Sequence, residues 1–284
     1  MAFRPRWWAA SFLAAWLVAP VSQARLDWAA FEQYQPAAQL LRFNTAGAST
    51  AGTLMIWPEQ GQTHYWLPMA TYWQQRGWDF IVLQPDPAQQ SFNPASEQPT
   101  AQQRQWQEQT ATRLSGVLAG LESSPPLLVV AQGSAALWYQ QLVDSTALPP
   151  PQALVLLDAL PVPAAEQQML AMSLARSPYP VLDIYSRPDS PLAWHNQRRR
   201  RQQLGSRGKT DYLVQHFAAP GMLEKQMASW LIRLGWLPLP PSAPDYLKEQ
   251  LKEQRHETGI SGSQNPGTGD NTARPGLRAP LANP

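Results

Sequence analysis

Short, continuously apolar runs alternate with helical patterns between residues 52 and 234, and this alternation constrains the fold more than any other feature. Unbroken apolar runs are typical of strands that are covered on both faces. We predict strands at residues 52–57, 80–83, 127–130, 153–157, 181–185 and 212–217. We predict helices between and after them at residues 67–76, 102–121, 135–143, 164–176, 192–204 and 223–234. Helices between strands give right-handed crossovers, so the expected fold class is α/β, a doubly wound and mostly parallel sheet.

The first 24 residues have the pattern of a secretory signal peptide. Arg4 and Arg6 precede an apolar run from Trp7 to Ala19, and small residues at Ser22 and Ala24 suit cleavage after Ala24. The alternative is an uncleaved membrane anchor, but a spanning helix needs about 20 apolar residues and this run is shorter. We therefore predict an exported protein with no membrane span after cleavage. The periplasm is the expected location, and the sequence does not separate it from secretion further.

The chain changes character again near its C-terminus. Residues 238–284 begin with a proline-rich linker and continue with a charged stretch, 245–257, that we predict to be a short exposed helix. Residues 258–284 contain almost nothing apolar to bury, so they cannot offset the entropy lost on ordering and are predicted to be disordered. These boundaries leave residues 25–237 as one folded domain.

Composition excludes several classes of function. The chain has no cysteine, which rules out disulfides, thiolate metal sites and a cysteine nucleophile. Four scattered histidines and no spaced carboxylate pairs predict no metal site, and no cofactor motif is present. Arg4 and Arg6 account for the formal net charge of +2, so the remaining charges balance and give no case for a nucleic-acid partner. The sequence does not indicate an oligomeric state.

The segment Ala131-Gln132-Gly133-Ser134 follows the predicted strand 127–130 and leads directly into a helix. Functional loops of doubly wound sheets lie beyond the carboxyl ends of the strands. A phosphate-binding loop would require Gly-x-Gly-x-x-Gly or Gly-Lys-Ser/Thr, and neither occurs here. The other interpretation is a nucleophile elbow, the tight strand-to-helix turn that usually reads Gly-x-Ser-x-Gly.

Several segments resemble the α/β-hydrolase superfamily, and most closely an uncharacterised family of exported proteobacterial proteins with a degenerate nucleophile elbow. The similar segments are 52–57, 65–68, 77–83, the elbow, 180–185, Arg199-Arg200 and the strand at Tyr212. Their order and spacing carry the resemblance, which covers about residues 26–236. The resemblance implies an α/β-hydrolase-type fold and leaves the activity open.

The resemblance places the nucleophile on Gly133, which has no side chain that could attack a substrate. Ser134 falls one residue later, where its backbone N–H would contribute to the oxyanion hole. A slip of one residue would instead bring Ser134 to the tip of the turn. Asp189 falls where the catalytic acid would lie, and its alternative is an ordinary turn aspartate beside a proline.

The base and the oxyanion loop depart from the family pattern. His216 lies two residues before the loop that should supply the base, and its alternative is a structural histidine in a strand. Neither His64 nor His195 occupies the base position. After the first core strand, Pro58-Glu59 replaces the family's His-Gly, so that a residue without N–H and a carboxylate stand where developing negative charge needs donors.

Two further features are a run of arginines and an abundance of tryptophan. Arg198 to Arg201 form either a solvated helix face or a surface for an anionic envelope component, and some of them are expected to pair with Asp183 or Glu166. Most tryptophans are expected in the core. Trp66, beside the strand-end cleft, is a candidate platform for a ligand.

Two functional interpretations follow. In the first, the chain lacks a standard triad and acts as a binding or accessory protein of the envelope, using a cleft formed around Gln132, Gly133, Glu59 and Trp66. In the second, it is a serine esterase or acyl hydrolase with Ser134 as nucleophile, Asp189 as acid and His216 as base. Both imply a small ester or lipid-like ligand, and the sequence leaves open whether the protein is an enzyme. A structural role of the glutamine-rich surface or the tail is a third class.

Overall fold

The computed structural model describes residues 34–35, 38–45, 47, 49–121, 125–217, 221–241, 243–246 and 249. The predicted signal peptide, the predicted disordered tail and most of the predicted charged helix at 245–257 lie outside these residues. The predictions for both ends of the chain therefore remain predictions.

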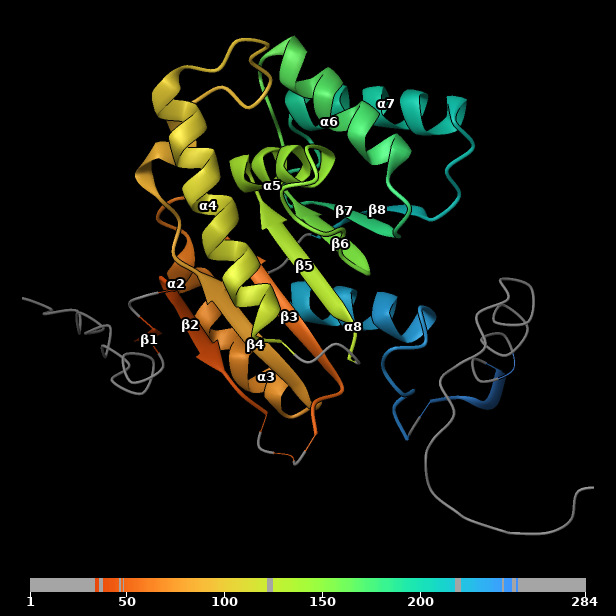
Figure 1. The fold of residues 1–284 in the computed structure, drawn as a ribbon. Coiled ribbons are helices and arrows are strands. Elements are labelled where there is room, and N and C mark those ends of the chain that lie inside the picture. The colour runs from red at the N-terminus through yellow and green to blue at the C-terminus, as the bar shows by residue number, and fades with distance from the viewer. Residues whose placement is uncertain are drawn as a thin grey trace, which may run out of the picture.

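The described residues form one eight-stranded sheet in the order β1-β2-β4-β3-β5-β6-β7-β8, flanked by helices (Figure 1). Strands β3 to β8 are parallel to one another, whereas at one edge β2 pairs antiparallel with β4 and β1 pairs antiparallel with β2. The strands are β1 (Tyr34–Gln35), β2 (Leu40–Phe43), β3 (Gly52–Trp57), β4 (Trp78–Leu83), β5 (Leu127–Gln132), β6 (Ala153–Leu157), β7 (Val181–Tyr185) and β8 (Tyr212–His216). The predicted doubly wound, mostly parallel sheet is confirmed.

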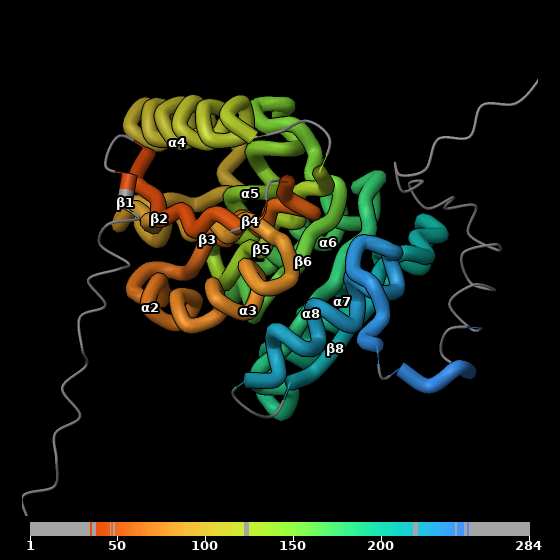
Figure 2. Tube along the Cα trace, turned by 90° about the horizontal axis from the view of Figure 1, so that it is seen from below, coloured from red at the N-terminus to blue at the C-terminus, as the bar shows by residue number. Residues whose placement is uncertain are grey.

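Helices cover both faces of the sheet (Figure 2). The α-helices are α2 (Thr63–Trp66), α3 (Ala70–Gln74), α4 (Ala101–Ala119), α5 (Ser134–Asp144), α6 (Ala164–Arg176), α7 (Pro191–Ser206) and α8 (Leu223–Arg233), and two short 3₁₀ segments are η1 (Leu67–Met69) and η2 (Pro87–Gln90). Helices α4 to α7 contribute buried side chains to one hydrophobic cluster, and α2, α3 and α8 contribute to the other. The helices therefore segregate into two layers with the sheet between them.

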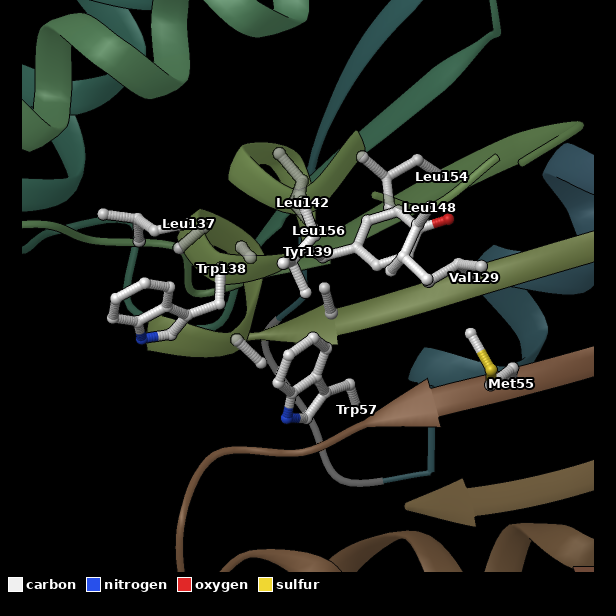
Figure 3. Packing of buried hydrophobic residues seen from close by; sticks show 14 of the residues in the cluster. Met55, Trp57, Val129, Leu137, Trp138, Tyr139, Leu142, Leu148, Leu154 and Leu156 are labelled. Carbon is white, nitrogen blue, oxygen red and sulfur yellow. The ribbon is translucent and has the colours of Figure 1, made fainter. Parts of the chain in front are cut away.

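The continuous apolar strands divide their side chains between these two layers. On β3, Leu54 and Ile56 belong to the cluster with α3 and α8, whereas Met55 and Trp57 belong to the cluster with α4 and α5. Successive side chains of a strand point to opposite faces, so a strand covered on both sides must be apolar at every position. Figure 3 shows Trp57 among the buried residues of the α5 layer, near the carboxyl ends of β3 and β5.

Three local predictions differ from the structure. The helix predicted at 67–76 is divided into α2, η1 and α3, with Pro68 in the 3₁₀ turn between the two helices, where its missing N–H is tolerated. The helix predicted at 192–204 extends to Pro191–Ser206. Strands β1 and β2 were not predicted, because they are short and lie at the edge of the sheet.

The strand register brings three loops to one place. Trp57 of β3 is opposite Ala131 of β5, and Gln132 of β5 is opposite Leu157 of β6. The residues that follow these strands therefore emerge side by side at the carboxyl edge of the sheet, which positions the candidate site.

Candidate functional site at the β5–α5 turn

The turn between β5 and α5 is the sharp reversal that the sequence predicts. β5 ends at Gln132, α5 begins at Ser134, and Gly133 between them has φ 58° and ψ −124°. Only glycine adopts such a positive φ without steric cost. The Gly133 N–H donates to the carbonyl of Leu157 on β6 at 2.9 Å, which fixes the turn to the neighbouring strand. The tip of the turn is therefore Gly133, and Ser134 is the first residue of the helix.

The carboxylate of Glu59 lies directly against this turn. Its Oε2 accepts a hydrogen bond from the Ser134 backbone N–H at 2.5 Å, and its Oε1 accepts from the Ser134 hydroxyl at 2.8 Å. A Cβ placed on Gly133 would lie 2.0 Å from Glu59 Oε2. The carboxylate thus occupies the space into which a side chain at position 133 would project.

Two further donors hold Glu59 in this position. The backbone N–H of Gln60 and the side-chain amide of Gln90 both donate to Oε1, at 3.0 and 2.9 Å. The N-terminus of α5 adds the positive end of a helix dipole, which favours an anion there. Glu59 therefore acts as a resident anion at the start of α5, with four donors around it.

A set of buried amides and indoles supports the turn from behind. Gln132 Oε1 accepts from the Trp66 indole N–H at 2.9 Å and from the Glu59 backbone N–H at 3.4 Å. Trp66 is fully buried, so its ring supports the turn and is not an exposed surface for a ligand. The structure thus brings together all four residues that the sequence assigned to the elbow and cleft: Gln132, Gly133, Glu59 and Trp66.

Gln89 is the part of the site that sequence reasoning missed. Its Oε1 accepts from the Trp57 indole N–H at 2.8 Å, and its Nε2 donates to the Ser134 hydroxyl at 2.9 Å. Its backbone carbonyl accepts from the Trp138 indole N–H at 2.7 Å. Gln89 lies 45 residues from Ser134 in η2, within a glutamine-rich stretch that carries no distinguishing signal.

A cleft of about 370 Å³ opens over this turn. Its walls come from η2 and the loop after it, the start of α5 and the loop between β6 and α6. The lining residues are Glu59, Gln89, Gln90, Phe92, Pro94, Gly133, Ser134, Leu137, Trp138, Asp158, Leu160, Pro161, Val162, Pro163 and Glu166. The cleft therefore combines apolar walls with three carboxylates.

The two carboxylates besides Glu59 differ in their partners. Asp158, at φ 48°, accepts hydrogen bonds from the backbone N–H of Ser186 at 2.8 Å and from its hydroxyl. Glu166, in the first turn of α6, has no hydrogen bond or ion pair with another described residue. Burial raises the pKa of the Glu166 carboxyl. Of the three, Glu166 is the one whose charge is uncompensated.

The predicted catalytic residues do not meet in the structure. Asp189 lies in the exposed turn after β7, and no hydrogen bond or ion pair joins it to another described residue. His216 is the exposed last residue of β8, opposite Tyr185 of β7. β8 is three strands away from β5, which corresponds to roughly 14 Å across the sheet. Among the described residues, no hydrogen bond connects Ser134 to Asp189 or to a histidine.

The arginine run contains one buried member. Arg200 forms an ion pair with Asp183 of β7 at 2.6 Å, also donates to the Tyr185 hydroxyl and the Ala159 carbonyl, and is fully buried. The predicted pairing with Asp183 is confirmed. Burial would lower the pKa of Arg200, but the adjacent Asp183 charge raises it overall. Arg200 thereby fastens α7 to the sheet.

The neighbours of Arg200 remain at the surface. The Arg198 guanidinium lies 5.4 Å from the centre of the Trp194 ring, and Arg199 donates to the side-chain oxygen of Gln168. Trp194 is 55% exposed, unlike Trp57, Trp73, Trp78, Trp138 and Trp230, which are buried as expected for core tryptophans. Trp194 faces solvent because it lies on a different side of α7 from the buried residues Ala193 and Asn196.

Within the described residues, no group of three or more histidine, aspartate or glutamate side chains could hold a metal ion. In the same part of the chain, no helix is both long enough and apolar enough to span a membrane.

Comparison with known proteins identifies a family and a fold. Residues 82–233 match the family described as "Protein of unknown function (DUF3530)". No curated protein sequence matches the chain.

Similar solved structures include TT1662 from Thermus thermophilus (12% identity, TM-score 0.49, 71% of this chain and 94% of that one). Others are acyl-protein thioesterase 2 from Zea mays (12%, 0.42, 68% and 97%) and an uncharacterised protein from Capnocytophaga ochracea DSM 7271 (11%, 0.50, 74% and 63%). At these identities the likeness concerns the fold alone. The fold is of the α/β-hydrolase type.

Proposed function

The chain belongs to the DUF3530 family, whose match spans more than half of it, and we propose that it is an exported α/β-hydrolase-fold protein whose nucleophile elbow is degenerate. It binds a small ester or lipid-like ligand in the cleft over Gly133 without cleaving it, as a binding or accessory protein of the periplasm. The family carries no assigned activity, so the argument rests on the site.

The contact between Glu59 and the elbow carries the proposal. A serine hydrolase needs a nucleophile at the tip of the turn and a free N–H just after it for the oxyanion. Here the tip is Gly133, and the N–H of Ser134 already donates to the Glu59 carboxylate. A carboxylate at this position repels the negative charge that develops in acyl transfer. The turn therefore has no nucleophile at its tip, and the N–H that would stabilise the oxyanion is already bound to Glu59.

The cleft itself suits a small ligand. Its volume of about 370 Å³ falls within the range of small-molecule sites, about 300–1,000 Å³. Phe92 and Val162 offer apolar contacts, and Gln90 offers an amide. A neutral ester or acyl group fits this lining better than an anion does, because Glu59, Asp158 and Glu166 also face the cleft.

The alternative is a serine esterase with Ser134 as nucleophile, Asp189 as acid and His216 as base. One observation favours it: the Ser134 hydroxyl lines the cleft and donates to a carboxylate at 2.8 Å. In this alternative His216, at the end of β8, has to reach Ser134 across the ends of two intervening strands, β6 and β7.

A labelling experiment separates the two functions. The purified mature chain is treated with a fluorophosphonate probe and assayed with p-nitrophenyl butyrate, beside Ser134→Ala and the control Ser206→Ala. We expect no covalent labelling and no ester hydrolysis in any of the three proteins. Labelling that is lost in Ser134→Ala but retained in Ser206→Ala would establish the esterase and overturn the proposal.

The binding role needs its own measurement. We expect an uncleavable analogue of a small ester, such as hexyl methyl ketone, to raise the melting temperature of the mature chain. Val162→Trp, which fills the cleft from its exposed rim, should abolish this shift, whereas Met222→Trp, at an exposed position that does not line the cleft, should leave it intact. A shift that survives in Val162→Trp would place the ligand elsewhere.

Export is tested on the expressed full-length protein. If residues 1–24 are a signal peptide, the protein recovered from the periplasmic fraction of a Gram-negative host begins at Arg25. Recovery from the cytoplasm or the membrane with residues 1–24 attached would overturn this part of the proposal.

A further inference from the structure

A groove lies at the opposite edge of the sheet from β8. It has a volume of about 760 Å³ and lies between α4 and the β2 edge, where Figure 2 shows α4 running along the sheet. Leu40, Ile81 and Val117 form apolar walls. The groove shares no lining residue with the cleft at the β5–α5 turn.

Helix α4 exposes bare backbone to this groove. Gly116 lies inside α4, and a Cβ placed on it would meet no atom within 4 Å. A glycine inside a helix costs about 1 kcal/mol relative to alanine, and nothing in the described residues packs against Gly116 in return. The helix therefore leaves space for another molecule to approach closely.

Arg113 lies on the same face of α4, one turn before Gly116, and it also lines the groove. Its Nη1 donates to the side-chain oxygen of Gln39, a residue held at φ 49°. Its Nε and Nη2 are buried and have no hydrogen-bond partner. Burial lowers the pKa of Arg113, and the charge of Asp86, which does not line the groove, opposes this shift without reversing it. No carboxylate among the described residues forms an ion pair with the guanidinium.

The two unpartnered nitrogens form one edge of the guanidinium. Nε–H and Nη2–H point in parallel, which is the geometry that binds a carboxylate through two hydrogen bonds. Both nitrogens are buried in this structure, so the edge meets a ligand in the groove only through a change of the Arg113 side-chain torsions, which also moves the Nη1 group that donates to Gln39. A ligand that satisfies this edge removes the penalty of an unpaired buried charge.

The other charges of the groove do not compete for this role. Arg42 already forms an ion pair with Asp79 at 3.3 Å. Glu108 is exposed, more than one turn of α4 before Arg113, and forms no ion pair with it. The uncompensated charge of the buried part of the groove is therefore positive.

We propose that the groove between α4 and β2 binds a single acyl chain that ends in a carboxylate, with the chain along the apolar walls and the carboxylate on the free edge of Arg113. This site is separate from the cleft at the β5–α5 turn, so it stands or falls independently of the function proposed above.

The test uses the mature chain with cis-parinaric acid, whose fluorescence rises on transfer to an apolar site, and with its methyl ester. Three variants accompany it. Arg113→Gln removes the charge, Gly116→Leu fills the groove, and Arg198→Gln removes a surface arginine of α7 that is not part of the groove.

We expect saturable binding of the acid by the unmodified chain and by Arg198→Gln. Arg113→Gln should weaken the acid by at least about tenfold, because charge-assisted hydrogen bonds are lost. The same variant should leave the weaker binding of the methyl ester unchanged. Gly116→Leu should abolish binding of both probes while the melting temperature is maintained, since leucine favours the helix.

Three results would overturn the proposal. The first is no saturable binding of the acid by the unmodified chain. The second is equal loss of acid and ester in Arg113→Gln. The third is full retention of binding in folded Gly116→Leu, which would place the probe elsewhere, with the Val162→Trp chain showing whether it occupies the other cleft.

Discussion

Arg200 and Arg113 lie in the same helix layer, toward opposite edges of the sheet, and differ in how their charge is compensated. Arg200 is fully buried and bound by the Asp183 carboxylate, the Tyr185 hydroxyl and the Ala159 carbonyl. Arg113 has one amide oxygen, from Gln39, and two buried nitrogens without a partner. Desolvation of a guanidinium costs free energy in both places, but only at Arg200 do partners within the fold offset this cost.

This difference indicates what each arginine is for. The Arg200 cluster joins α7 to β7 and β8, since the Tyr212 hydroxyl also donates to Asp183 at 2.5 Å. Burial and the Asp183 charge raise the pKa of Tyr212 well above its usual range, so this hydroxyl stays a donor. Such a network stabilises one arrangement of elements. Arg113 stabilises nothing comparable and is free to meet a ligand.

The largest effect on the unfolding free energy is expected from a substitution of Arg200. Arg200→Met removes the cation and leaves the Asp183 carboxylate buried without its charge partner, which we expect to cost about 3–5 kcal/mol of unfolding free energy. Urea unfolding measures it. The double variant Asp183→Asn/Arg200→Met should recover much of the loss, and a single variant as stable as the unmodified chain would contradict the interpretation.

A smaller loss is expected at the elbow, where the buried charge is an anion held by uncharged donors. Glu59→Ala leaves the N–H of Ser134 and the amide of Gln90 without their acceptor, but water from the cleft can replace it. We expect a cost of about 1–3 kcal/mol in urea unfolding. Glu97→Ala, at an exposed position outside the cleft, is the matched control and should change little. Equal costs for the two variants would show that Glu59 does not stabilise the turn.

Arg113→Gln should not show the large loss of unfolding free energy that is expected for Arg200→Met. Glutamine can keep a contact to Gln39 while it removes an unpaired buried charge, so we expect the unfolding free energy to stay within about 1 kcal/mol or to rise. The measurement is the same urea titration in the absence of ligand. A loss as large as that of Arg200→Met would mean that Arg113 has a structural partner.

The smallest effect concerns Glu166, the unpartnered carboxylate of the cleft. Burial raises the pKa of the Glu166 carboxyl in the folded state above its usual 4.5. Between the raised pKa of the folded state and the usual pKa of the unfolded chain, the folded protein therefore binds more protons than the unfolded chain. Ionisation of Glu166 therefore destabilises the fold at pH 7 and not at pH 4. Glu166→Gln should raise the melting temperature slightly at pH 7 and leave it unchanged at pH 4. The exposed control Glu97→Gln should show no such difference between the two pH values. An effect of Glu166→Gln on the melting temperature at pH 4 but not at pH 7 would contradict the prediction.

The positions of the core strands and their parallel direction could be predicted because the signal is local. The core strands are mostly apolar, and helical patterns separate them along the chain. The β5–α5 turn was predictable for the same reason, since Gly133 stands between an apolar strand and a helix. β1 and β2 carry no such signal, because segments of two and four residues at the edge of a sheet do not differ from a loop in the sequence.

The site was only partly predictable because its contacts are long-range. Glu59 and Ser134 are separated by 75 residues, and the sequence indicated that Glu59 was wrong for an oxyanion loop but not that it would bind the elbow itself. Gln89 and Arg113 were missed, since one of many glutamines and an arginine on a polar helix face look ordinary in the sequence. Their roles depend on which groups the fold brings to them.

The packing of Glu59 against Gly133 also limits how this scaffold could change. A serine placed at 133 would collide with Glu59 Oε2 and would have to accept a backbone conformation that side chains disfavour. Shortening Glu59 first would open the space but still leave no attacking group. If the function proposed above holds, a gain of hydrolysis would require replacements at several distant points of the chain, and no single one of them would be sufficient. Loss of catalysis is therefore an easier evolutionary change for this scaffold than its recovery.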